Sequence, residues 1–184
     1  IRWYLSPIGF LGASTTFNFL AGFNGLEAKQ GILILLGLAF ATYFIGRTEV
    51  SLIALCMVAA LIAFYTFHRF PAKVFPGDVL TYSVGGMIAI IAIVGNVEKI
   101  AVFFFIPYFL EILFKIRGKL NKHNFGIPKE NGSLDLRYEK TYSLTHLSLK
   151  ILRKIKKNPT EREVVWLINA FQLWIILLAI LIFL

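Results

Sequence analysis

Asp78 is the residue whose type and position point most directly to chemistry. It follows Pro76 and Gly77 at the start of a long apolar block. A carboxylate at a membrane boundary is costly unless it is paired, solvated or bound to a cation. One interpretation is an oxygen ligand for Mg²⁺, which prefers a few carboxylates together with substrate phosphate oxygens. The alternative is an acidic residue that stabilises the beginning of a helix.

A second polar group lies near the beginning of the chain, where Asn18 and Asn24 are separated by a glycine-containing stretch. A side-chain amide can pair with the edge of a base or bind a metal through its oxygen. Glycines such as Gly22 let the backbone approach a ligand closely. The alternative is a polar turn that closes a helix. Similarly, Phe75 could stack on a flat ligand or could be an aromatic residue of the membrane interface.

A third group lies in a long basic segment, where Lys122 and His123 offer donors for a phosphate. The alternative for both is a solvated loop. Glu111 falls inside an apolar block, where an acid is a functional candidate by default, although it could also face a bundle interior or snorkel. His68 and Arg69, at the end of another apolar block, are interpreted as interface anchors.

The elements that must position these residues are membrane-spanning helices. Hydrophobic residues make up 58% of the 184 residues and charged residues only 16%. The apolar blocks lack strict alternation, and backbone groups in a bilayer must be satisfied internally, so helices are expected. The predicted fold class is therefore all-α, a multi-pass transmembrane helix bundle. About six spans are predicted, at Tyr4–Phe23, Gly31–Gly46, Val50–Phe67, Val79–Val97, Ile100–Ile116 and Val165–Leu184.

The connections between these spans predict their orientation. From Lys115 to Glu163 there are thirteen basic and five acidic side chains, which accounts for most of the net charge of +9. The positive-inside rule places this fifth connection in the cytoplasm, and the first and third with it. The three groups of polar residues then converge at one cytoplasmic mouth. A basic segment beside a membrane is normally an orientation signal or a lipid contact, so we expect no nucleic-acid partner.

The chain is predicted to be one membrane domain, 1–184. Its residues 117–163 form a cytoplasmic basic loop that contains an amphipathic interfacial helix. The apolar residues at helical spacing in that loop are Leu144, Leu147, Ile151, Leu152 and Ile155. Asn169 and Gln172, in the last span, are expected to make hydrogen bonds between helices. The single cysteine, Cys56, excludes a disulfide within the chain. Polar residues gathered at one face favour an enzyme over a transporter, which would place them near the midplane.

Two motifs carry a specific resemblance. Residues 18–30 read Asn-x-x-Ala-Gly-x-Asn-Gly-Leu-Glu-Ala-x-Gln, and residues 75–78 read Phe-Pro-Gly-Asp. Both resemble the polyprenyl-phosphate N-acetylhexosamine-1-phosphate transferases, and in particular the eukaryotic and archaeal UDP-GlcNAc–dolichyl-phosphate GlcNAc-1-phosphotransferases. The bacterial relatives typically have an Asp-Gly-Leu/Ile-Asp-Gly version of the first motif. The stretch Gly-Ser-Leu-Asp at 132–135 also resembles the dolichol-type loop.

The resemblance implies a function and a set of roles. The protein would transfer GlcNAc-1-phosphate from UDP-GlcNAc to a polyprenyl or dolichyl phosphate and release UMP, the first step of lipid-linked glycan assembly for N-glycosylation. The cofactor would be Mg²⁺. The implied metal ligands are Asn18 and Asp78; the nucleotide-sugar contacts are Asn18, Gly22, Asn24, Glu27, Phe75, Lys122 and His123; and the catalytic residues are Asp78 and His123. The membrane would be the cell membrane of an archaeon or the ER membrane of a eukaryote, and a homodimer is one expected assembly.

Two departures from the family pattern stand out. Asn124 occupies a position after the histidine where a second arginine is usual. Family members have about ten spans, and the N-terminal half normally supplies an Asp-Asp pair that does not occur in this sequence. We therefore expect a C-terminal part of a longer transferase, inactive or nearly so by itself. Two alternatives stay open: a related transferase using another sugar or undecaprenyl phosphate, and a nucleotide-sugar transporter.

Overall fold

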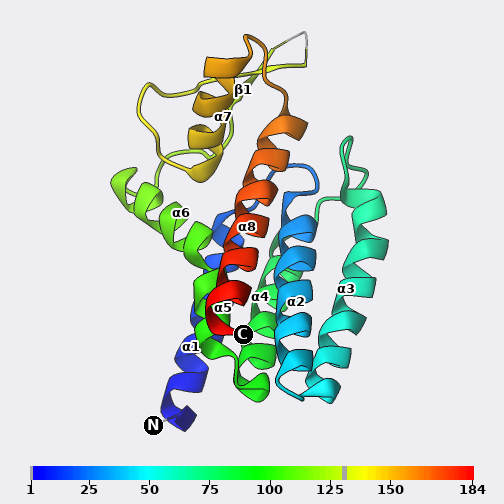
Figure 1. The fold of residues 1–184 in the computed structure, drawn as a ribbon. Coiled ribbons are helices and arrows are strands. Elements are labelled where there is room, and N and C mark those ends of the chain that lie inside the picture. The colour runs from blue at the N-terminus through cyan, green and yellow to red at the C-terminus, as the bar shows by residue number, and fades with distance from the viewer. Residues whose placement is uncertain (1, 130–131) are drawn as a thin grey trace.

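Helices form almost all of the regular structure in the computed structural model, which describes residues 2–129 and 132–184. The long helices run side by side as a bundle, and a smaller segment caps one end of it (Figure 1). In chain order the helices are α1 (Arg2–Phe19), α2 (Leu26–Phe44), α3 (Thr48–His68), α4 (Gly77–Gly95), α5 (Glu98–Phe104), α6 (Ile106–Arg117), α7 (Leu144–Ile155) and α8 (Glu161–Phe183). The two strands are β1 (Ile127–Pro128) and β2 (Leu134–Asp135).

Four helices within the described residues are long and apolar enough to cross a membrane, namely α2, α3, α4 and α8. Large hydrophobic side chains are exposed along α3 and α8, which is the pattern of surfaces that face lipid rather than water. The predicted fold class, an all-α multi-pass membrane bundle, is confirmed. The number of single uninterrupted spans is smaller than the six predicted, because α1 does not reach the same apolarity and the fifth predicted span is broken.

The second predicted span begins earlier than expected, at Leu26 instead of Gly31. Gly25 precedes it in the left-handed conformation, with φ of 77°, and turns the chain directly into the helix. Glu27 and Lys29 lower the mean hydropathy of the first turn, so hydropathy alone does not assign these residues to the span. Glu27 is nevertheless buried inside the bundle, as are its neighbours Leu26 and Ala28.

The fifth predicted span, Ile100–Ile116, consists of two helices that meet at Phe105. Pro107 occupies the first turn of α6 and has no N–H to donate to the preceding helix, so the α5 ladder ends there. α6 then leaves the bundle at a steep angle and carries the chain toward the capping segment (Figure 1). The prediction of one continuous span here was wrong.

A close approach of α1 and α4 sets the position of their ends. The two helices pack along each other, and a methyl group added at Gly85 would lie 2.7 Å from both the Ala13 carbonyl oxygen and the Ser14 Cα. These are backbone atoms, which cannot rotate away. Only glycine therefore allows this spacing, which brings the C-terminal end of α1 next to the first turn of α4.

We expect Gly85→Ala to lower the free energy of unfolding by about 1–3 kcal/mol, because overpacking forces the two backbones apart. Gly12→Ala is the matched control: a methyl group added there meets no atom within 4 Å. Because alanine favours a helix over glycine by about 1 kcal/mol, the control should be neutral or stabilising. Thermal unfolding in detergent measures both changes. Equal stability of the two variants would contradict this packing.

Polar side chains join the helices inside the bundle. The Gln30 amide donates to Asn169 at 3.2 Å and accepts from the Tyr108 hydroxyl at 3.3 Å. The Gln172 amide donates to the Phe104 carbonyl at 3.0 Å. The prediction that Asn169 and Gln172 make hydrogen bonds between elements is confirmed. Glu111 faces the interior, where its carboxylate accepts from the Leu144 backbone N–H at 2.6 Å and joins α6 to the beginning of α7.

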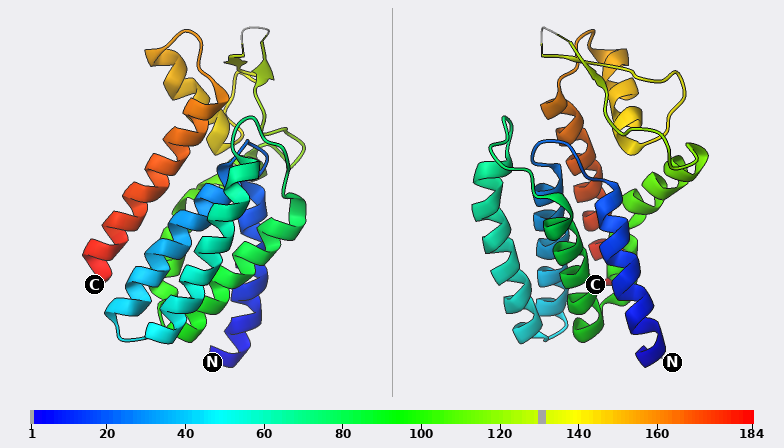
Figure 2. Two further views of the ribbon diagram at one scale, coloured as in Figure 1. Left: turned by 90° about the vertical axis from the view of Figure 1, so that its right-hand side faces the viewer. Right: turned by 180° about the vertical axis from the view of Figure 1, so that it is seen from behind.

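The capping segment comprises β1, β2 and α7 with their connections, residues 118–129 and 132–160, and it lies between α6 and α8 (Figure 2). Its two short strands are antiparallel, with Ile127 opposite Asp135. The predicted amphipathic helix is present as α7, and the Ser143 side chain accepts from the His146 backbone N–H at its start. Asp135 pairs with Lys129 at 2.9 Å and with Arg153, which ties the sheet to α7. The position of α7 on a membrane surface stays a prediction.

His146 gives this segment an expected acid sensitivity. Burial lowers the pKa of His146 below the usual histidine value, and the positive charges of Lys150 and Arg137 lower it further. The unfolded chain takes up a proton at this ring below about pH 6.5, whereas the folded chain resists it. Burial of the neutral His146 ring therefore has no proton-linked cost above that pH, and the free energy of unfolding decreases as the pH falls below it.

We accordingly expect the amide hydrogen-exchange protection of α7 to fall between pH 7 and pH 5, after correction for intrinsic rates. His146→Phe, which keeps an aromatic ring beside Tyr138, should remove most of this dependence. His123→Gln serves as the control, because His123 is exposed. An unchanged pH dependence in His146→Phe would assign the effect to other groups.

Candidate functional site

Three chain segments far apart in the sequence meet at one end of the bundle. They are the α1–α2 loop (residues 20–25), the α3–α4 loop (69–76) and the α6–α7 segment (118–129 and 132–143), and they lie opposite the tight α2–α3 and α4–α5 turns (Figures 1 and 2). A cavity of about 410 Å³ opens between them. Its lining is Asn18, Ala21, Gly22, Glu27, Phe75, Pro76, Gly77, Asp78, Lys115, Lys122, His123, Asn124 and Phe125. Every predicted site residue except Asn24 is in this set.

Asp78 and Asn18 face each other across the close α1–α4 contact. The Asn18 Nδ2 donates to Asp78 Oδ1 at 3.1 Å and lies 3.4 Å from the Tyr82 hydroxyl. The Thr81 hydroxyl donates to Asn18 Oδ1 at 3.2 Å. Asp78 is exposed in the first turn of α4, and no side chain caps that helix start through a hydrogen bond. The Asp78 carboxylate therefore points to Asn18 and the cavity rather than to its own backbone.

These two side chains fit the first ligands of a magnesium ion. In the described part of the chain, hydrogen bonds reach only one oxygen of Asp78, so the other is available to a cation. The Asn18 amide could turn over and present its oxygen instead, because the Thr81 hydroxyl can accept as well as donate. No three His, Cys, Asp or Glu side chains gather among the described residues. Mg²⁺ usually keeps several waters and takes substrate phosphate oxygens, so a sparse protein set is sufficient.

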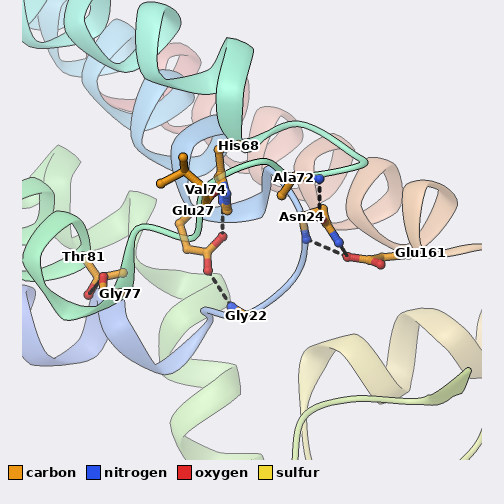
Figure 3. Close-up of polar contacts among 9 residues, drawn as sticks. All are labelled: Gly22, Asn24, Glu27, His68, Ala72, Val74, Gly77, Thr81 and Glu161. Atoms are coloured by element: carbon orange, nitrogen blue, oxygen red, sulfur yellow. Dashed lines mark hydrogen bonds and ion pairs between the residues drawn. The ribbon is translucent and has the colours of Figure 1, made fainter.

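Glu27 ties the α1–α2 loop to the α3–α4 loop (Figure 3). Its Oε1 accepts from the Gly22 backbone N–H at 2.5 Å, and its Oε2 lies 2.8 Å from His68 Nε2. The other nitrogen of His68 lies 3.2 Å from the Val74 carbonyl oxygen. Gly22 adopts a φ of 117°, which favours glycine, and this conformation turns its N–H toward Glu27. Both oxygens of Glu27 are thus used within the protein.

His68 was predicted to be an interface anchor, and this prediction was wrong. The side chain is fully buried, between Glu27 and the α3–α4 loop. A carbonyl oxygen only accepts, so the nitrogen facing Val74 must carry a proton. The other nitrogen then either donates to a Glu27 carboxylate as part of an imidazolium or accepts from a protonated Glu27. In both states the pair holds the two loops in one arrangement.

Asn24 lies outside the cavity. Its backbone N–H and its Nδ2 each donate to Glu161 Oε1 at 2.6 Å, and its Oδ1 accepts from the Ala72 backbone N–H at 2.8 Å (Figure 3). The side chain thereby joins the α1–α2 loop to the α3–α4 loop and to the start of α8. A contact between Asn24 and a nucleotide would require these bonds to be exchanged.

An aromatic ring and three basic or imidazole side chains complete the cavity. Phe75 is 61% exposed, so one face of its ring is free to stack. Lys122 lies with its ammonium group 5.0 Å from the Tyr138 ring centroid, which holds the cation at the rim. Lys115, which the sequence interpretation counted only as loop charge, also lines the cavity with His123. The cavity that contains Asp78 therefore also contains basic side chains, which are suited to a phosphate group.

Asn124 and Phe125 anchor the α6–α7 segment to the other loops. The Asn124 side chain donates to the Phe19 carbonyl oxygen at 3.3 Å, and the Asn124 backbone carbonyl accepts from the Thr145 hydroxyl at 2.6 Å. The Phe125 ring packs on Phe23 and covers Gly22. Asn124, at the position where the family usually has arginine, thus joins α1 to the capping segment.

Comparison with known proteins gives this geometry a family context. The sequence profile of glycosyl transferase family 4 matches residues 1–96. A protein of Saccharolobus solfataricus with the provisional name UDP-N-acetylglucosamine–dolichyl-phosphate N-acetylglucosaminephosphotransferase is 37% identical over 149 residues, which are 80% of this chain and 46% of that protein. A provisionally named glycosyltransferase of Methanocaldococcus jannaschii is 32% identical over 176 residues, 93% of this chain and 57% of that protein.

A bacterial relative is also similar. The phospho-N-acetylmuramoyl-pentapeptide-transferase of Clostridium perfringens is 30% identical over 118 residues, 60% of this chain and 37% of that protein. The chain spans about half the length of the archaeal relatives that it matches. The matched segment of the family profile contains Asn18, Gly22, Glu27 and Asp78, which the structure brings to one cavity. The chain belongs to glycosyl transferase family 4.

Proposed function

We propose that the whole protein transfers GlcNAc-1-phosphate from UDP-GlcNAc to a polyprenyl phosphate, with dolichyl phosphate as the preferred acceptor, and releases UMP. The observation that carries this proposal is the cavity in which Asp78 and Asn18 lie 3.1 Å apart, beside Lys115, Lys122 and His123. Oxygen ligands for a divalent cation and positively charged side chains are what a diphosphate substrate requires. The family membership and the name of the Saccharolobus solfataricus relative support the same reaction.

Each residue has a role in this proposal. Asp78 and Asn18 hold Mg²⁺, which when bound neutralises charge on the diphosphate. The Lys122 ammonium and the His123 ring bind phosphate and sugar oxygens, and the Phe75 ring stacks on the uracil. An oxygen of the lipid phosphate attacks the β-phosphorus, the bond from that phosphorus to the bridging oxygen breaks, and UMP leaves with the electron pair. Glu27 and His68 keep the loops in place during this step.

The proposed orientation places the cavity in the cytoplasm, where nucleotide sugars are available. The excess of basic residues between Lys115 and Glu163 supports this orientation through the positive-inside rule. The identity of the sugar rests on the α6–α7 segment, whose Lys122, His123 and Asn124 lie at the cavity edge.

Identification of the released nucleotide tests the proposal. Membranes holding this chain, with and without the N-terminal half of a family member, receive UDP-GlcNAc, Mg²⁺ and dolichyl phosphate. We expect UMP, and only when both halves are present. UDP as the product would mean that the sugar is transferred without its phosphate. Uptake of intact UDP-GlcNAc into sealed vesicles without cleavage would support a transporter instead.

A further inference from the structure

A second cavity, of about 520 Å³, lies at the same end of the bundle and shares no lining residue with the first. It opens between α2, the end of α3, the α3–α4 loop and the beginning of α8. Four basic side chains line it: Lys29, Arg69, Lys73 and Arg162. No role in the proposed transfer involves these four residues.

The charge of this cavity is not neutralised inside the protein. Within residues 2–129 and 132–184, none of its four cations forms an ion pair with a carboxylate. Glu161 directly precedes Arg162 in the sequence, but one of its carboxylate oxygens already accepts two hydrogen bonds from Asn24. Even with Glu161 counted, the cavity keeps an excess of positive charge. Four cations held around one space without a carboxylate partner among the described residues repel one another, and a bound anion would remove that electrostatic cost.

Aromatic rings hold two of the cations in place. The Lys29 ammonium lies 5.3 Å from the Tyr65 ring centroid and 4.9 Å from that of Trp166. The Arg162 guanidinium lies 4.6 Å from the Phe70 ring centroid. A cation–π contact orients a charge without cancelling it. Arg162 Nη2 also donates to the Phe70 carbonyl oxygen at 3.4 Å. These two cations are therefore preorganised, and the Lys29 ammonium and the remaining N–H groups of Arg162 are available to an oxygen ligand.

The position of the cavity indicates the source of that ligand. Lys29 is in the first turn of α2, Tyr65 in the last turn of α3 and Trp166 in the second turn of α8. All three helices are long and apolar enough to span a membrane. Trp166 is 68% exposed on the outer side of α8. Tryptophan and tyrosine at the ends of spans mark the headgroup layer, where basic side chains meet anionic lipids.

We propose that this cavity is a binding site for the phosphate headgroup of an anionic phospholipid of the surrounding leaflet. The phosphodiester oxygens accept from Lys29, Arg69 and Lys73, and the acyl chains leave along the exposed face of α8 beside Trp166. Such a lipid would also brace the corner where Asn24 joins Ala72 and Glu161. The inference is independent of the reaction proposed above.

Trp166 provides a local reporter for the test. The protein carrying Trp3→Phe and Trp174→Phe is reconstituted in phosphatidylcholine vesicles with a rising fraction of phosphatidylglycerol whose acyl chains are brominated, and quenching of the remaining tryptophan is recorded.

In this background, Lys29→Gln/Arg69→Gln/Lys73→Gln removes three cavity charges. Lys140→Gln/Lys154→Gln/Lys157→Gln removes three exposed charges elsewhere. We expect half-maximal quenching of the cavity variant to need at least tenfold more phosphatidylglycerol than that of the unsubstituted background or the control.

If the two triple variants raised the phosphatidylglycerol fraction at half-maximal quenching equally, the effect would come from general surface charge, and the proposal would be overturned. The single variant Lys73→Gln, at an exposed residue, should shift the curve in the same direction by a smaller factor, and it tests the site if the triple variant does not fold. Inorganic phosphate added in large molar excess to half-quenched protein should leave the quenching unchanged. Recovery of fluorescence at phosphate concentrations comparable to the lipid would identify a soluble anion as the ligand and overturn the lipid assignment.

Discussion

Asp78→Asn is expected to lower the rate of phosphosugar transfer by roughly 10²–10³-fold or more, which is the size of effect seen when one electrostatic contact to a reacting centre is removed. The substitution keeps the shape of the side chain. In the unsubstituted protein Asn18 Nδ2 lies 3.1 Å from the Asp78 carboxylate, and the amide oxygen of the new asparagine can still accept this hydrogen bond. It removes only the negative charge that the proposed metal site needs. Initial rates of UMP release measure the effect, in membranes that hold equal amounts of this chain together with the N-terminal half.

Two control variants separate metal binding from other causes. Tyr82→Phe removes a hydroxyl 3.4 Å from Asn18 Nδ2 and leaves the charge in place, so its rate should stay close to normal. Asp135→Asn removes one carboxylate from the capping segment, where it pairs with Lys129 and Arg153, and it tests for a general effect of net charge. A rate for Asp78→Asn within threefold of the unsubstituted protein would remove Asp78 from the metal site.

Glu27→Leu is expected to lower the same rate by roughly 10²-fold, because a shift of about 1 Å in a positioning element can have that effect. The leucine would leave the Gly22 N–H and the His68 Nε2 without the oxygens that they contact at 2.5 Å and 2.8 Å. The α1–α2 loop would then move relative to Asp78. The melting temperature in detergent should also fall, since His68 is fully buried and Gly22 is partly buried.

Glu27→Gln is the informative companion variant. Its side-chain oxygen can accept from Gly22, and its NH₂ group can donate to an unprotonated His68 Nε2, so every hydrogen bond of the network can be kept. We expect a rate within about tenfold of normal, in keeping with a positioning role. If Glu27→Gln were as inactive as Glu27→Leu, the carboxylate would act on the substrate directly, and the positioning role would be wrong.

The gathering of Asn18, Gly22, Phe75, Asp78 and Lys122 in one cavity could be predicted without coordinates. The alternation of successive spans predicted that the first, third and fifth connections share one side of the membrane, and charge predicted that this side is cytoplasmic. Side chains at one end of a small bundle are necessarily close together. The structure brings these residues together as expected. Motif and topology were independent arguments for the same cluster.

The supporting contacts were beyond the reach of the sequence. His68 stands at the end of an apolar block, where an interface anchor is the usual interpretation. Its partner Glu27 is 41 positions away and was hidden in a stretch interpreted as a loop. Asn24 is similar, since its partner Glu161 is 137 positions away. Long-range pairs of this kind leave no periodic pattern in a single sequence. The break at Phe105 had a visible signal in Pro107, which the hydropathy of the block concealed.

The central claim is that the β-phosphorus of the nucleotide sugar moves to the lipid together with the sugar. UDP-GlcNAc labelled with ³²P at the β-position tests it most directly, with the whole protein, Mg²⁺ and dolichyl phosphate. We predict that the label enters the lipid fraction in equal molar amount with GlcNAc, that the released UMP is unlabelled, and that Asp78→Asn lowers the initial rate of labelling by roughly 10²-fold or more. Label that stays with a released UDP, or in intact UDP-GlcNAc, while GlcNAc reaches the lipid or crosses the membrane, would contradict the claim.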